Sequence, residues 1–176
     1  VQDVWAIHWH NVANRASVFL LSLWPAEILV GLTGSPAAGI ITYGFLFYVA
    51  PLIGLVGTLA ADRSRGRIFF AYACASTALL CPLIFGFPTE MWMAHALFWP
   101  TLALAHYARP GVRGAAALSI AIVALVLAHE GGVVLAFVVV ATLALHGLRH
   151  PLFLRGATVL FGAMALWIIV KMLYPP

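Results

Sequence analysis

The sequence is poor in charged residues, and this scarcity sets its class. Only 8% of its 176 residues are charged and 64% are hydrophobic, with a mean hydropathy of +1.06. A soluble domain of this size cannot bury so much apolar surface, so the composition predicts a polytopic integral membrane protein. The net charge of +4 does not indicate nucleic-acid binding, because the arginines cluster in short loops and Lys171 is the only lysine.

Cysteine is equally scarce. Cys74 and Cys81 are the only two, and both lie in an apolar run, where a thiol is usually a small core residue. The chain has no HExxH motif and no cysteine pair with histidines downstream, so no zinc-binding spacing is present. It begins without methionine, and residues 3–14 do not resemble a signal peptide, so we expect a processed or partial chain.

The apolar runs predict an all-α fold, a polytopic helical membrane protein forming one integral membrane domain over residues 1–176. In the N-terminal segment 1–34, tryptophans recur at helical spacing along the polar stretch 1–15, which indicates an interfacial amphipathic helix. The apolar residues 17–32 either cross the membrane with a kink or continue along its surface. Residues 37–173 form the transmembrane bundle. About six membrane-embedded helices are expected, at 37–60, 68–85, 89–107, 114–128, 133–145 and 156–173.

Residues 114–145 form the most apolar run, and His129-Glu130-Gly131-Gly132 interrupts it. As one straight helix this run would be roughly 48 Å long, well over the roughly 30 Å of bilayer hydrocarbon. It would also place an ionisable pair near the membrane centre, which is unfavourable. We therefore expect a short-helix hairpin that turns at this pair, with the two glycines permitting a tight backbone.

Seven of the eight arginines fall in three short loops, at residues 62–67, 108–113 and 146–155. The positive-inside rule predicts that these loops are cytoplasmic in a bacterial cytoplasmic (inner) membrane. Successive spans bring all three loops to one face only if 114–145 is a hairpin, which supports the turn independently of helix length. The outer face then collects nearly every acid except Asp62.

Polar side chains expected at the outer face are the candidates for a functional site. Carboxylates and imidazoles at a membrane interface serve as general bases, metal ligands or acceptors for sugar hydroxyls. Each also has a structural interpretation, such as a helix-dipole partner, a buried hydrogen-bonded histidine or the end of a short helix. The candidates are Asp3, His8, His10, Glu90, His95, His129 and Glu130, with Arg15 as an available cation.

The sequence resembles the GT-C-type glycosyltransferases in four features. These are short spans, a broken hydrophobic hairpin, an acid-bearing interfacial segment and a His-Glu pair at an outer helix end. These polytopic enzymes use polyprenyl-linked sugar donors at the outer face of the membrane. The resemblance implies the same activity here, with membrane lipid and a lipid-linked sugar as partners and a divalent metal ion as a candidate cofactor. It makes Asp3 the candidate base or metal-linked carboxylate, with Glu90, His129 and Glu130 as further catalytic candidates. The substrate-binding candidates are then His8, His10, Arg15 and His95.

Two non-enzymatic functions stay open. The histidines sort by depth into an outer pair, His95 and His129, and an inner pair, His106 and His146, and facing imidazoles ligate haem in b-type membrane cytochromes. The same-helix separations of 11 and 17 residues differ, and the break at Gly131 disfavours two stacked haems. The many small residues favour close helix packing, which also allows an accessory subunit bound to other membrane subunits in a larger complex.

Overall fold

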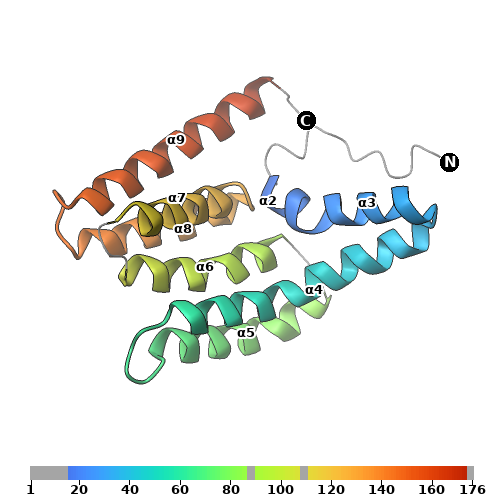
Figure 1. Ribbon diagram of the computed structural model, residues 1–176, viewed down its shortest axis with the longest axis horizontal. Coiled ribbons are helices and arrows are strands. Elements are labelled where there is room, and N and C mark those ends of the chain that lie inside the picture. Colours follow the sequence, from blue (N-terminus) through green and yellow to red (C-terminus); the bar gives the residue numbers. More distant parts are fainter. Residues whose placement is uncertain (1–15, 87–89, 108–110, 174–176) are drawn as a thin grey trace.

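The protein is a bundle of helices, shown in Figure 1 as a computed structural model. The structure describes residues 16–86, 90–107 and 111–173, and no strand occurs within these ranges, which confirms the all-α expectation. The elements in order are α2 (Ala16–Val18), η2 (Phe19–Leu23), α3 (Trp24–Thr33), α4 (Pro36–Ala61), α5 (Ile68–Gly86), α6 (Met91–His106), α7 (Val112–Val126), α8 (Glu130–Ala144) and α9 (Pro151–Leu173).

The N-terminal apolar segment is one continuous helix with a widened turn. Elements α2, η2 and α3 run from Ala16 to Thr33, and the π-helical turn η2 lies just before Pro25. Proline has no N–H to bond the carbonyl four residues back, so a change in the hydrogen-bond pattern is expected at this place. The backbone N–H of Trp24 bonds the carbonyl of Phe19, five residues back. Residues 16–33 thus form a helix long and apolar enough to cross a membrane.

Three helices of the described chain have the length and apolar composition to cross a membrane. They are Ala16–Thr33, α4 and α9. Shorter apolar helices cover Ile68–Cys81, Val112–Val126 and Glu130–Ala144. Of the six expected helices, those at 37–60 and 156–173 correspond to α4 and α9, and the other four stay a prediction as membrane spans.

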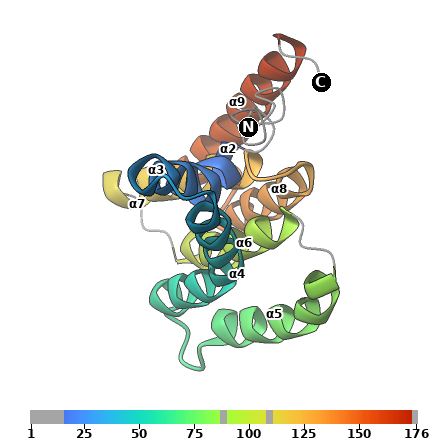
Figure 2. The ribbon, with the colours of Figure 1, turned by 90° about the vertical axis from the view of Figure 1, so that its right-hand side faces the viewer.

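Helix α6 lies at the centre of the bundle, with α4 on one side and α8 on the other. One core cluster joins α6 to α7, α8 and α9 around Ile122, Leu125, Leu143 and Leu160, all fully or almost fully buried. A second, smaller cluster joins α6 to α4 and α2. Figure 2 shows α5 and α9 on opposite sides of this central group.

Glycine sets how closely α4 approaches α6. A Cβ atom at Gly54 would overlap the backbone carbonyl of Ala96 on α6. The two backbones are therefore in direct contact, as small residues allow in helix pairs within membranes.

The predicted hairpin is confirmed as two helices, α7 and α8, each starting two or three residues earlier than expected. Helix α9 also starts earlier, at Pro151, which occupies the first helical position that proline favours. The Nδ1 atom of His150 accepts a hydrogen bond from the N–H of Leu152 at 3.3 Å. Arg155 therefore lies on a helix and not, as the sequence suggested, in a loop.

Both ends of the bundle have a distinct character. The α4–α5 loop, the start of α7 and the α8–α9 turn, all arginine-bearing, lie at the left-hand end in Figure 1. The turn between α7 and α8 lies toward the opposite end, next to α2. Within the described residues, the three arginine-bearing segments therefore lie at one end of the bundle and the turn between α7 and α8 lies toward the other.

Candidate functional site

The candidate site is built on the turn that joins α7 to α8. Helix α7 ends at Val126, and His129 has an extended backbone with φ −170° and ψ 159° before α8 begins at Glu130. The N–H of Gly132 bonds the carbonyl of His129 at 2.8 Å. A Cβ atom at Gly132 would overlap the carbonyl oxygen of Leu125, so the turn can close only with glycine there.

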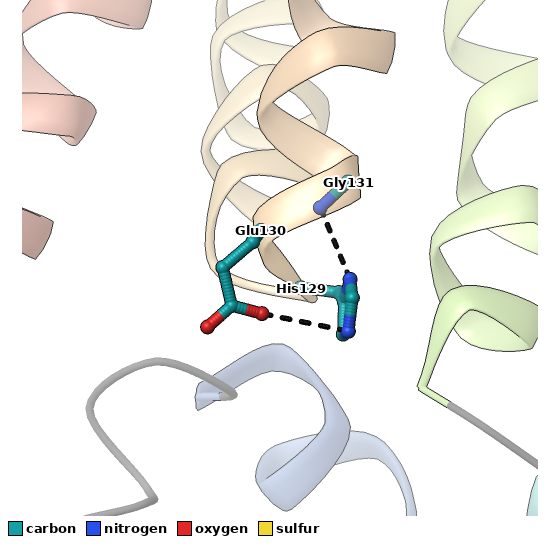
Figure 3. A network of polar contacts seen from close by, with 3 residues as sticks. All are labelled: His129, Glu130 and Gly131. Atoms are coloured by element: carbon teal, nitrogen blue, oxygen red, sulfur yellow. Dashed lines mark hydrogen bonds and ion pairs between the residues drawn. The ribbon is translucent and has the colours of Figure 1, made fainter. Parts of the chain in front are cut away.

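His129 is the N-cap residue of α8. Its Nδ1 atom accepts a hydrogen bond from the N–H of Gly131 at 3.0 Å, which satisfies one of the free donors at the helix start (Figure 3). Because Nδ1 accepts, the ring proton of the neutral imidazole is assigned to Nε2. The Nε2 atom lies 3.4 Å from Oε2 of Glu130. One side chain therefore both caps the helix and places its second ring nitrogen beside a carboxylate.

Glu130 is a solvent-accessible carboxylate at the positive end of a helix dipole. Its side chain is 47% exposed, against 24% for His129. A carboxylate in the first turn of a helix interacts favourably with the free N–H groups and the dipole. The pair thus combines an accessible carboxylate with an adjacent imidazole.

Glu90 comes to the same end of the bundle from a distant part of the sequence. It immediately precedes Met91, the first residue of α6. A Cβ atom at Gly131 would contact the sulfur of Met91, so the starts of α6 and α8 pack directly on each other. The contact between Ala94 and Gly132 continues this packing one turn further along. Two carboxyl-bearing helix starts, 40 residues apart in the sequence, therefore lie side by side.

The start of the N-terminal helix is attached to the same turn. Ser17 donates its backbone N–H to the carbonyl of Leu127 at 3.1 Å and its hydroxyl to the carbonyl of Ala124 at 2.7 Å. Figure 3 shows the blue ribbon of this segment passing below His129 and Glu130. The predicted site residues that precede this helix, Asp3, His8, His10 and Arg15, lie outside the described residues.

His95 faces another part of the molecule. Its Nε2 atom accepts a hydrogen bond from the indole N–H of Trp99 at 3.2 Å and lies 2.9 Å from the hydroxyl oxygen of Ser76 on α5. It also stacks on Trp92, with ring centroids 5.9 Å apart. His95 therefore points toward α5, whereas the face of α6 that carries Ala94 meets α8. The structure does not bring His95 to the His129–Glu130 pair.

No group of three or more His, Cys, Asp or Glu side chains with the geometry of a metal site occurs among the described residues. The haem hypothesis requires imidazole nitrogens with a free lone pair. In this arrangement the Nε2 lone pair of His95 is engaged, and His106 packs its ring against Phe69 and Tyr107. Both cysteines are free thiols, and both are partly buried and not core residues.

Asp62 has a role that the sequence analysis missed. It is fully buried at the end of α4, and its carboxylate accepts hydrogen bonds from the N–H of Ser64 at 2.8 Å and of Phe70 at 3.0 Å. Burial alone would raise the pKa of this carboxyl, but the hydrogen bonds from Ser64, Phe70 and Phe69 outweigh it and lower the pKa below its ordinary value.

Asp62 thus caps α5, together with the Ser64 hydroxyl that accepts from the N–H of Ile68 at 2.7 Å. The signal was present in the sequence as an Asp and a Ser just before a long apolar run, which is an N-terminal capping pattern.

Comparison of the chain with protein families, with curated proteins and with solved structures found no match. The functional conclusion therefore depends on the residues themselves.

Proposed function

We propose that the protein is a membrane-embedded, glycosyltransferase-like enzyme that acts on a polyprenyl-linked sugar at the outer face of a bacterial cytoplasmic membrane. One observation carries the proposal: the starts of α6 and α8 pack on each other, which brings Glu90 and the His129–Glu130 pair to one end of the bundle. Three helices of spanning length and the arginine-bearing loops at the other end support the membrane orientation.

The chemistry assigned to Glu130 is that of a general base. In glycosyl transfer the acceptor hydroxyl oxygen forms a bond to the anomeric carbon of the donor sugar, while the bond from that carbon to the polyprenyl phosphate oxygen breaks. The proton of the hydroxyl moves to a carboxylate, and the polyprenyl phosphate leaves as an anion. Glu130 is half exposed at a helix start, so its carboxylate oxygens are accessible to a sugar hydroxyl.

His129 acts through Glu130. Its Nε2 atom lies 3.4 Å from Oε2 of Glu130, and the proposed role of the imidazole is to orient this carboxylate. Glu90, at the adjacent helix start, is a second carboxyl group at the same end of the bundle. Such a surface suits hydroxyl-rich ligands, because carboxylate oxygens are strong hydrogen-bond acceptors.

The test uses the purified full chain in liposomes with a panel of radiolabelled undecaprenyl-phosphate hexoses and measures release of the sugar to water or to an added acceptor. We expect Glu130→Gln to lower the rate by roughly 10²-fold or more, the range of general-base contributions, without changing helix content. Glu27→Gln is the control, because it makes the same substitution at a glutamate on another helix, α3.

An accessory subunit would behave differently. It would co-purify with a stoichiometric membrane partner and would retain complex formation in both variants. Absence of any turnover with the whole donor panel, together with such a partner, would replace the transferase proposal.

A further inference from the structure

A second polar feature lies at the arginine-bearing end of the bundle, far from the turn between α7 and α8. A cavity of about 440 Å³ opens between the α4–α5 loop, the end of α6 and the start of α7. Arg63 comes from the loop, Tyr107 follows α6, and Arg113 lies in the first turn of α7. Two cations distant in sequence therefore line one cavity.

The electrostatics of the cavity favour an anion. Its lining contains two arginines and no acid among the described residues. The first turn of α7 also faces this region, and its N-cap, Gly111, supplies no side-chain hydrogen bond. The free N–H groups of the helix start therefore add positive potential to that of the guanidinium groups. Arginine pairs with phosphate through two parallel hydrogen bonds, which makes it the preferred cation for such a ligand.

Arg63 is carried by an ordered loop. Its neighbour Asp62 directs its buried carboxylate toward the N–H groups of Ser64 and Phe70, so it does not neutralise the arginine by pairing with it. Arg67 of the same loop donates to the carbonyl groups of Leu59 and Asp62 and closes the loop onto the end of α4. The backbone that presents Arg63 is thus fixed at both ends.

We propose that this cavity binds the phosphodiester headgroup of an anionic membrane phospholipid, such as phosphatidylglycerol. The location favours a lipid over a free anion, because apolar side chains, Leu104 and Val112, share the lining with the arginines. Val112 is 85% exposed at the mouth, where the lipid's glycerol and first acyl carbons would lie. Basic pockets between membrane helices on the cytoplasmic side are suited to anionic headgroups. This site is independent of the transferase chemistry proposed for the opposite end.

The test is native mass spectrometry of the full chain in neutral detergent, titrated with dioctanoyl-phosphatidylglycerol, with dioctanoyl-phosphatidylcholine or with inorganic phosphate. We expect binding of phosphatidylglycerol to exceed that of phosphatidylcholine by roughly tenfold or more, since charge-assisted hydrogen bonds are the stronger ones. The double variant Arg63→Gln, Arg113→Gln should lose this preference. The control double variant Arg65→Gln, Arg149→Gln removes the same charge from exposed positions outside the cavity and should retain the preference.

A second variant guards against misfolding. Val112→Glu places a carboxylate at the mouth of the cavity, in the first turn of α7, where it is favourable for the helix but repels an anion. It should also abolish the lipid preference. Equal losses in the control double variant would show a diffuse charge effect and overturn the site. Displacement of the lipid by millimolar inorganic phosphate would show a free-anion site and overturn the lipid assignment.

Discussion

His129 is expected to have two separable roles, one in stability and one in activity. As N-cap of α8 it accepts the Gly131 N–H at 3.0 Å, and its Nε2 atom faces Glu130 at 3.4 Å. Loss of a cap costs about 1 kcal/mol, and loss of a partly exposed polar contact adds at most about 1 kcal/mol. His129→Ala should therefore lower the free energy of unfolding by about 1–2 kcal/mol. For a chain of this length that corresponds to a fall in Tm of roughly 2–8 °C.

His129→Asn separates the two roles. The asparagine carbonyl can accept the Gly131 N–H, since asparagine is among the best N-cap residues, but it has no N–H at the position of Nε2. We expect most of the stability to return, whereas sugar release in the liposome assay stays at least tenfold below the parent rate. Stability is measured by SDS-induced unfolding in bicelles, followed by circular dichroism.

Either of two results would refute this reasoning. Full activity in His129→Asn would show that the imidazole serves only as a cap and does not orient Glu130. Unchanged stability in His129→Ala would show that the cap at the start of α8 does not contribute as the geometry indicates.

Three further predictions concern the scaffold. Gly54→Ala should destabilise the bundle by about 1–3 kcal/mol, because the added Cβ overlaps the Ala96 carbonyl. Gly44→Ala in the same helix meets open space and should be neutral or slightly stabilising. Equal Tm values for the two variants would contradict the close contact of α4 and α6. Asp62→Asn should cost about 1–3 kcal/mol at pH 7. Because folding lowers the pKa of Asp62, its contribution to the free energy of unfolding is fully present above the unfolded pKa of about 3.9. This contribution is lost as the pH falls through the folded pKa, so the stabilities of parent and variant should converge only in acid. A constant difference in stability down to pH 2 would count against this. Ser17→Ala should weaken the attachment of α2 by about 1 kcal/mol and raise hydrogen exchange at the start of that helix, and unchanged exchange would argue against the bond to Ala124.

The hairpin could be predicted from the sequence because two independent constraints agree on it. The run of residues 114–145 is too long for one span, and the arginine loops reach one end only if it turns. The first constraint depends only on the length of one run, and the second depends only on the positions of the arginines and the number of helices between them. Neither requires knowledge of how the helices pack. The turn forms at His129, as expected.

The partners of individual side chains could not be predicted in the same way. Glu90 and His95 lie on one short stretch, yet the start of α6 meets α8 while His95 meets Ser76 on α5. Which face of α6 each neighbour covers is decided by the packing of the whole bundle. The same holds for Arg63 and Arg113, which are 50 positions apart and line one cavity.

The central claim is that the His129–Glu130 turn and the arginine-bearing loops occupy opposite faces of a membrane. The most direct measurement is labelling of single cysteines at positions 130 and 65 by an impermeant thiol reagent, in a background with Cys74 and Cys81 replaced by alanine. Both positions are exposed in the structure. We expect labelling of position 130 in intact cells and of position 65 only after permeabilisation. Labelling of both from the same side, or of position 130 from neither side, would contradict it.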